Sequence, residues 1–262
     1  MAYVEGVGLL GPGINSWPAG SAILRGEIPY QPQKTLYPLV ALLPPTERRR
    51  ASQVVKLALA VGLEAAAQSA LAPANLPAVF ASSAGDNQNC HAICEALTTA
   101  ERQISPTRFH NSVTNAPAGY WSIATDARLP STVICAFDAS FGAGLLEALA
   151  QVVVDATPSI LIAYDIDYPE PLHSARPIPD GLGVALVLAA QRTERSLFKL
   201  QVTLTQDDPD KLSSNALEAL RLAIPAARAL PLLHTLARGE AARVVLDYLD
   251  TARIAVELTP SP

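Results

Sequence analysis

Charged residues are scarce in this chain, and their scarcity excludes several classes of protein. Only 16% of the 262 residues are charged, while 50% are hydrophobic, and the net charge of -5 is small. A composition this apolar supports a large core and argues against a disordered chain. The weak, dispersed charge gives no electrostatic basis for binding nucleic acid.

Cysteines and long apolar runs are also few. The three cysteines, Cys90, Cys94 and Cys135, cannot form a disulfide framework, which is typical of a reducing compartment. No uninterrupted apolar run reaches the ~18 residues that a membrane span needs. The first residues lack the basic and then apolar pattern of a signal peptide. We therefore expect a cytoplasmic protein that is not inserted into a membrane.

Two motifs that often bind cofactors are present only in part. Residues 6–11 match the Gly-x-Gly-x-x-Gly pattern, but Pro12 and Gly13 predict a loop where a dinucleotide-binding helix should begin. Cys90 and Cys94 share one helix face, and no second Cys/His pair lies nearby to complete a zinc site. We expect these thiols to be buried as small apolar groups, and we expect neither a cofactor nor a metal.

The pattern of apolar residues predicts alternating strands and helices in one α/β domain. Residues 18–45 are rich in proline and predict an irregular excursion, and residues 168–180 predict a loop. Strands are expected at 3–10, 78–82, 133–137, 159–164, 183–190, 198–204, 243–249 and 253–258. Helices are expected from 46 onward, at 89–97, from 115, at 139–154, from 213 or 214 to 224, and at 226–236.

The segment 130–149 contains the clearest functional pattern. A short apolar strand at 133–137 precedes the long apolar helix 139–154, and Asp138 lies at the turn between them. Several enzyme folds place a nucleophile at such a turn, facing the positive end of the helix dipole. An aspartate at that position favours helix capping, so we expect Asp138 to cap this helix.

A set of short motifs occurs in a recognisable order. They are a glycine-rich strand end followed by tryptophan, an Asn-x-x-Ala-Gly helix start, a Pro-Ser pair before the elbow, and shortened Arg-Pro and Asp-Gly elements. These are Gly6–Gly13 with Trp17, Asn115–Gly119 with Ser122 and Ile123, Pro130-Ser131, and Ala175–Pro177 with Asp180, Gly181 and Gly183. In this order the motifs resemble the N-terminal half of the β-ketoacyl synthases, which have the thiolase fold.

The resemblance implies a thiolase-like layered α/β/α fold that is truncated, with an incomplete C-terminal half. It implies one domain over 1–262, in which 1–190 resembles the N-terminal half and 191–262 is a shortened remnant. In the family, a cysteine at the elbow accepts the acyl group and two C-terminal histidines assist it. Counting from Gly119 through Pro130 places Asp138 at the cysteine position, and the only histidine after residue 190 is His234.

Without those groups, the chain is similar to chain length factors, inactive relatives that pair with an active ketosynthase. It also resembles truncated proteins of the type II polyketide systems that make aryl polyene pigments. The resemblance implies a non-catalytic subunit of a heterodimer that shapes or stabilises the site of the growing acyl chain. An acyl carrier protein is a further possible partner, and no cofactor is implied.

Other functions remain open from the sequence. Ser140 lies between strand and helix and would suit a serine hydrolase, although such an elbow requires glycine where Asp138 stands. A homodimeric binding protein without catalysis and a residual decarboxylase are further alternatives. The sequence leaves open the acyl substrate, its chain length, the choice between homo- and hetero-oligomer, and the arrangement of residues 191–262.

Three further polar features have less specific interpretations. His110 stands alone and is expected to be structural. The arginines at 48–50 suit a solvated helix face, with docking of an acidic acyl carrier protein as the alternative. Asp165 and Asp167 follow a predicted strand in a proline-rich setting, and we interpret them as loop residues that aid solubility.

Overall fold

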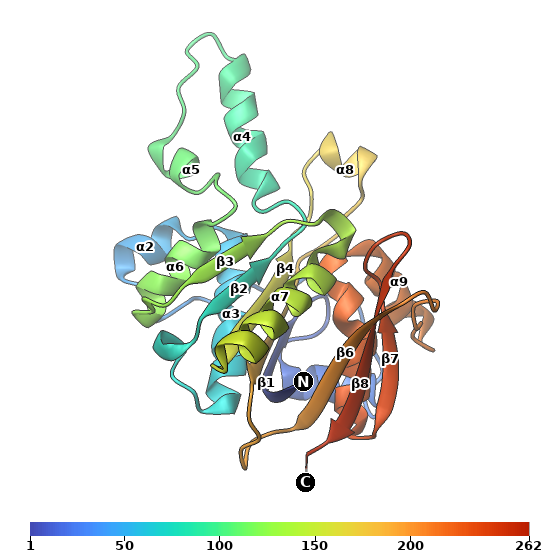
Figure 1. The fold of residues 1–262 in the computed structure, drawn as a ribbon. Coiled ribbons are helices and arrows are strands. Elements are labelled where there is room, and N and C mark those ends of the chain that lie inside the picture. Colours follow the sequence, from blue (N-terminus) through green and yellow to red (C-terminus); the bar gives the residue numbers. More distant parts are fainter. Residues whose placement is uncertain (262) are drawn as a thin grey trace.

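Within residues 1–261, a single mixed sheet of eight strands, in the order β3-β2-β4-β5-β1-β6-β8-β7, forms the centre of the molecule (Figure 1). This computed structural model describes residues 1–261. The strands are β1 Ala2–Leu10, β2 Ala78–Ala81, β3 Ser131–Ile134, β4 Ser159–Asp165, β5 Leu182–Ala189, β6 Phe198–Thr205, β7 Ala242–Leu246 and β8 Arg253–Pro260.

Helices cover both faces of this sheet, which confirms the predicted α/β/α layering. The α-helices are α1 Trp17–Leu24, α2 Pro45–Arg50, α3 Gln53–Ser69, α4 Asn87–Thr98, α5 Pro106–His110, α6 Ala116–Thr125, α7 Ser140–Asp155, α8 Leu172–Ala175, α9 Asn215–Ala223 and α10 Leu230–Arg238. Three 3₁₀ turns are η1 Pro73–Asn75, η2 Phe137–Ala139 and η3 Pro225–Ala229. In Figure 1, α4 and α5 extend away from the layered body.

The central strands are buried on both faces, and their sequences reflect this. Every residue of β4 and β5 is buried, so these strands are nearly continuous apolar runs rather than alternating ones. Their side chains divide between two cores. Leu186 of β5 faces the core formed with α7, α9 and α10, while Ile162 of β4 faces the core formed with α3 and α6.

Strand direction changes across the sheet. β2 pairs parallel with β3 and β4, and β5 pairs antiparallel with β4 and β1. From β1 onward, β6, β8 and β7 add antiparallel strands to the same sheet. Residues after 191 therefore do not build a separate sheet; they lengthen the first one and return α9 and α10 over its α7 face.

The glycines of the Gly-x-Gly-x-x-Gly segment at residues 6–11 allow a helix to approach β1. A Cβ atom at Gly6 would lie 2.1 Å from the carbonyl oxygen of Ala65, and one at Gly8 would lie 2.0 Å from that of Val61. Both carbonyls belong to α3, which crosses β1 at these two positions. The Gly-x-Gly spacing thus provides close packing between helix and strand.

Some boundaries differ from those that the sequence predicts. The excursion 18–45 contains most of α1, whose start is marked by Ser16 accepting a hydrogen bond from the Ala19 amide at 3.4 Å. The helix expected from residue 46 is two helices, because Ala51 is extended between α2 and α3. A short helix, α8, lies inside the loop expected at 168–180.

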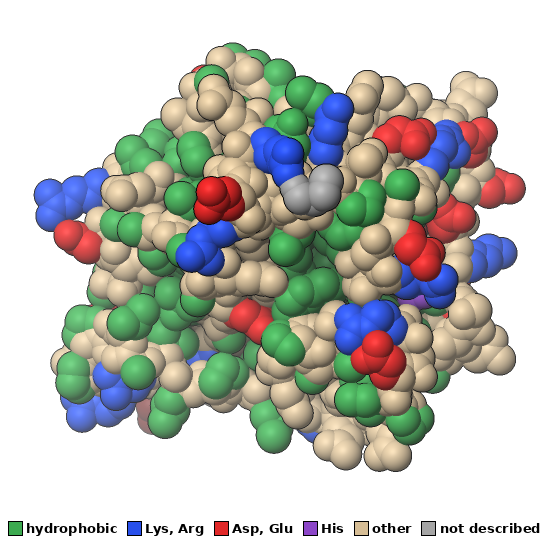
Figure 2. Space-filling model, turned by 90° about the horizontal axis from the view of Figure 1, so that it is seen from below, with side chains coloured by type: hydrophobic (Ala, Val, Ile, Leu, Met, Phe, Trp, Pro, Cys, Tyr) green, Lys and Arg blue, Asp and Glu red, His purple; other side chains and the backbone are tan. Residues whose placement is uncertain are grey.

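Helix α7 is the most apolar long helix, and with η2 it has the length and composition of a membrane span. Half of that stretch, Phe137–Asp155, is buried inside the protein. Its side chains Phe141, Leu145 and Val152 belong to the core on the α7 face. We therefore interpret α7 as a core helix. On the face shown in Figure 2, apolar side chains gather in and beside a central hollow, and charged ones are scattered around it.

Candidate functional site

The predicted elbow is present as a sharp turn between β3 and α7. The strand ends at Ile134, three residues before its predicted end, and η2 carries the chain into the helix. Phe137 has a φ of +53°, a left-handed conformation that is uncommon for a bulky residue. The residue is 62% exposed. The backbone turn thus falls on Phe137, one residue before Asp138.

Asp138 does not cap α7, so the predicted role is wrong. The N-cap position of α7 is Ala139, which makes no side-chain capping bond. Ser140 instead stabilises the turn, because its Oγ accepts from the Ala136 amide at 3.1 Å and donates to the Phe137 carbonyl at 2.7 Å.

Two arginines form ion pairs with the carboxylate of Asp138, whose side chain is 43% exposed. Nη2 of Arg176 contacts Oδ1, and Nη2 of Arg228 lies 3.3 Å from Oδ2. Arg176 comes from the end of α8, and Arg228 comes from η3. The elbow is therefore held from two separate parts of the chain.

The ion pairs continue from Asp138 into the C-terminal segment. Nη1 of Arg228 lies 3.1 Å from Oδ1 of Asp247, which also contacts Arg221. The Arg221 side chain is 4% exposed and pairs with Glu218 at 2.6 Å. Hydrogen bonds from Arg221 lower the pKa of Glu218 to about 2. Together with Asp138 and Arg176, these residues form a charge-balanced chain of three arginines and three carboxylates, which we call the elbow network.

The guanidinium of Arg176 also lies against aromatic rings. Its Cζ atom is 3.6 Å from the centroid of the Phe137 ring and 5.7 Å from that of Tyr168. Nη1 of Arg176 is 3.4 Å from the Tyr168 hydroxyl, which contacts Ser83 Oγ at 3.0 Å. Arg176 thus joins the exposed ring of Phe137 to Asp138 and to the interior.

Asp165 lies behind the elbow at the end of β4, and it is not the solvated loop residue that the sequence suggests. It is buried, and its carboxylate accepts hydrogen bonds from the amides of Ser83 and Ala226, each at 2.8 Å. Burial raises its pKa to about 6, although these amides and nearby Arg176 act in the opposite direction. Asp165 therefore connects β2, β4 and η3.

The remaining candidate residues lie apart from one another. Ser140 is 1% exposed and bonds to backbone, and within residues 1–261 no histidine contacts it. His234 lies in α10, where burial and Arg238 lower its pKa. His110 is exposed and packs edge-on to Tyr120, 6.4 Å away between ring centroids.

The thiols are less buried than the sequence predicts. Cys90 is half-buried, and Cys94 and Cys135 are exposed. Cys135 precedes the elbow, and partial burial together with the nearby carboxylate of Asp165 raises its pKa. A raised pKa leaves less of the nucleophilic thiolate near neutral pH.

The family described as β-ketoacyl synthase, N-terminal domain, matches residues 24–246. The chain belongs to this β-ketoacyl synthase family. The match begins later and extends further than the predicted resemblance over residues 1–190, and it includes most of the C-terminal segment.

Solved structures confirm the thiolase-like ketosynthase fold of this β-ketoacyl synthase family member. A chain of the complex between the ketosynthase ApeO and its chain length factor ApeC, from Xenorhabdus doucetiae, is 23% identical, with a TM-score of 0.72 over 98% of both chains. The ishigamide ketosynthase/chain length factor gives 16% identity and a TM-score of 0.73, over 100% of this chain and 99% of the other. A chain of the type II polyketide synthase complex AntDE:AntF is 11% identical, with a TM-score of 0.74 over 99% of each chain. No curated protein matches the chain.

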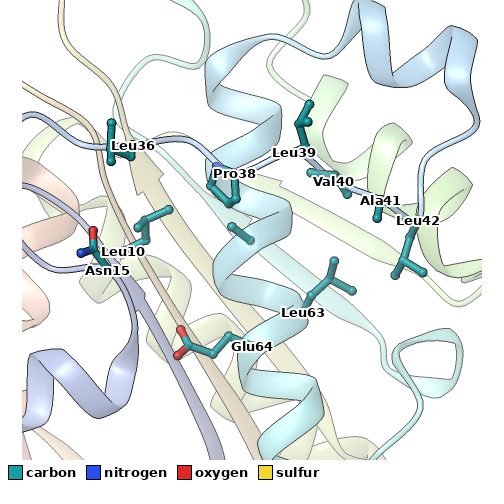
Figure 3. A pocket seen from close by; sticks show the side chains of 11 residues that line it. Leu10, Asn15, Leu36, Pro38, Leu39, Val40, Ala41, Leu42, Leu63 and Glu64 are labelled. Atoms are coloured by element: carbon teal, nitrogen blue, oxygen red, sulfur yellow. The ribbon is translucent and has the colours of Figure 1, made fainter.

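A separate cavity of about 400 Å³ lies on the α3 face of this β-ketoacyl synthase family member (Figure 3). The strap at 36–42 runs over it, and Leu63 and Glu64 reach it from α3. Glu64 accepts from the amides of Leu9 at 2.9 Å and Trp17 at 2.7 Å, and burial raises its pKa. This carboxylate therefore connects α3 to β1 and to the first residue of α1.

Proposed function

We propose that this chain is a non-catalytic, chain length factor-type subunit. It pairs with an active ketosynthase in the cytoplasm and helps to shape or stabilise the acyl or polyene chain site in fatty-acid or polyketide-type biosynthesis. The observation that carries this proposal is the state of Asp138, a carboxylate bound by two arginines at the position where the family's nucleophile is expected.

The chemistry of the elbow supports the absence of catalysis. Condensation through an acyl-enzyme needs a nucleophile activated by a base or by a lowered pKa. A carboxylate is a weak nucleophile toward a thioester, and Arg176 and Arg228 each take one oxygen of Asp138. Within residues 1–261, no histidine contacts Asp138. The neighbouring thiol, Cys135, has a raised pKa.

The free edge of the sheet supports pairing with another subunit. β3 is an edge strand with β2 as its neighbour, and it is half-exposed. The amides of Ala78 and Ser82 bond to the carbonyls of Pro130 and Ile134. Because strand residues alternate in direction, the backbone groups of Ser131 and Val133 point away from β2. They are available to a strand from a partner.

Apolar side chains flank this edge. Leu129 precedes β3, and Val153 and Val154 lie at the end of α7 and are exposed. Gln151 of α7 bonds to Thr132 of β3 at 3.2 Å, which places this end of the helix beside the strand. An unpaired strand bordered by exposed apolar residues is the form expected of an interface between subunits.

Co-expression with a ketosynthase of the same organism tests the proposal. Size-exclusion chromatography with light scattering should give a one-to-one complex, and that complex should condense acyl and malonyl carrier thioesters. The chain alone, or its Asp138→Cys variant alone, should not condense them. The proposal is contradicted if the chain is stable and monodisperse but does not bind the ketosynthase, or if it remains a homodimer when the ketosynthase is present.

A matched pair of variants locates the interface. Ser131→Pro removes an outward-facing amide at an exposed first strand residue, a position where proline is tolerated. The loss of one interface hydrogen bond should weaken the complex about five- to tenfold. Ser131→Ala keeps the amide and should leave the affinity unchanged. Equal affinities of the two variants would place the interface elsewhere.

A further inference from the structure

We infer that Phe137 is an anchor residue that inserts into an apolar pocket of the partner ketosynthase, and that Asp138 and Arg176 are positioning residues for it. This inference rests on the proposed pairing of subunits through β3. It gives the elbow of this chain a use that does not involve a nucleophile.

The first observation is an exposed ring on a strained backbone. Phe137 is 62% exposed and has a φ of +53°. Left-handed backbone at a residue with a Cβ atom is unfavourable, and such outliers persist where surrounding contacts enforce them, often at functional sites. Burial within the monomer does not explain the conformation, because the residue is mostly exposed.

The second observation is that both the backbone and the ring of Phe137 are fixed from one side. Ser140 donates to its carbonyl at 2.7 Å. The guanidinium of Arg176 lies 3.6 Å from the ring centroid. Arg176 is itself held by Asp138 and by the Tyr168 hydroxyl. The ring is therefore presented in one orientation before any partner arrives.

This arrangement matches the physical requirements of an interface anchor. Aromatic residues that fill a partner's pocket carry much of the binding energy of an interface. A side chain ordered in advance loses little entropy on binding. The side chain of Phe137 has no polar group, so the partner pocket that receives it must be apolar. The guanidinium of Arg176 covers one face of the ring, so the partner must contact the other face.

The position of Phe137 connects it to the proposed interface. β3 is the edge strand, and Phe137 follows its last residue, Ile134, by three positions. A partner strand that pairs with β3 therefore brings its subunit to the elbow. The contact is continuous with the paired edge, and we assign the pocket to the ketosynthase subunit.

Replacement of Phe137 by glycine gives a sharp test. Phe137→Gly removes the ring and also relieves the positive φ. The isolated variant should therefore unfold at a temperature no lower than that of the wild type. Its affinity for the purified ketosynthase subunit, measured by titration calorimetry, should fall about 30-fold or more, as for a hot-spot residue. A residue that served only the monomer's fold would not separate these two readouts.

Two other variants complete the experiment. Leu204→Ala truncates a residue that is 63% exposed on β6, away from the β3 edge, and should not change the affinity. Arg176→Met keeps the length of the stem but frees the ring, and should weaken binding by less than Phe137→Gly. If the wild type binds the ketosynthase and Phe137→Gly binds it with the same affinity, Phe137 is not an anchor. This holds also if Phe137→Gly changes the length of the product without changing the affinity. A wild type that does not bind overturns the proposed function and the anchor with it.

Discussion

Asp138 and Asp165 illustrate how far a residue's role depends on partners that are distant in the sequence. Asp138 meets Arg176 and Arg228 across separations of 38 and 90 residues. Asp165 meets Ser83 and Ala226 across 82 and 61 residues. Local pattern assigns a helix cap to the first aspartate and a solvated loop to the second. Tertiary contacts give both a different environment.

Asp165 makes the stability of the chain depend on pH. Its folded-state pKa of about 6 lies above the ordinary value of 3.8, because burial disfavours the charged form. The folded state therefore binds more protons than the unfolded chain between these values. The stabilisation is fully present below pH 4 and is lost as the pH rises through 6, a change of about 3 kcal/mol.

Denaturant unfolding of Asp165→Asn between pH 4 and pH 7 checks this dependence. The variant cannot titrate at residue 165, so its free energy of unfolding should fall less with rising pH than that of the wild type. Asp167→Asn changes a more exposed carboxylate two residues away and should keep the wild-type slope. Parallel curves for the wild type and Asp165→Asn would show that Asp165 does not carry the effect.

At the scale of elements, the sequence predicts well where apolar periodicity is long. Within residues 1–261, seven of the eight strands and the helices α3, α4, α6, α7 and α9 lie close to their predicted positions, while β3 is shifted toward the N-terminus and shares only two residues with its predicted range. The failures have physical causes. Helix α1 is short and follows a loop rich in glycine and proline, and the break between α2 and α3 comes from one extended residue, Ala51. Neither is encoded by a periodic pattern.

The crossing of α3 over β1 is the packing contact most sensitive to a single atom. A methyl group at Gly8 would meet the Val61 carbonyl at 2.0 Å, a backbone atom that cannot rotate away. Gly8→Ala should lower the free energy of unfolding by about 2–3 kcal/mol, as overpacking of a core does. Gly119→Ala in α6 meets nothing within 4 Å and should raise it by about 0.5–1 kcal/mol.

Thermal and denaturant unfolding of these two variants measure the contact directly. Both make the same chemical change, from glycine to alanine, so the opposite signs isolate the effect of the crossing. If Gly8→Ala were as stable as the wild type, α3 would have to lie farther from β1 than the structure places it.

Across the molecule, the two edges of the sheet differ: a loop is hydrogen-bonded to the β7 edge, whereas the β3 edge is free within residues 1–261. The motif order predicts the layered fold because each motif is local to a strand end or a helix start. It does not predict how residues after 191 extend the sheet, since strand pairing there is set by long-range contacts between β1, β6 and β8. The same extension moves one edge from β1 to β7, while β3 remains the other edge.

The edge at β7 is closed by the loop that follows β6. Asp210 accepts a hydrogen bond from the Val245 amide through Oδ2 at 2.7 Å, and its own amide donates to the Val245 carbonyl at 2.9 Å. Arg243 of β7 also pairs with Asp207 in this loop. These contacts satisfy groups that would otherwise recruit a foreign strand. The contrast with β3 supports a single edge for assembly.

Removing the Asp210 carboxylate should reopen the β7 edge. Asp210→Ala deletes the acceptor for the Val245 amide, and the loss of this bond should lower the free energy of unfolding by about 1 kcal/mol. The freed backbone should also promote self-association, seen by light scattering as a mass that grows with concentration. Asp208→Ala removes the same charge from an exposed site in the same loop, so it controls for lost repulsion and should remain like the wild type. The proposed pairing with a ketosynthase should survive in both variants, because the proposal places it at the opposite edge. If Asp210→Ala instead abolished that pairing, the partner would bind at β7, and the division of roles between the two edges would be reversed.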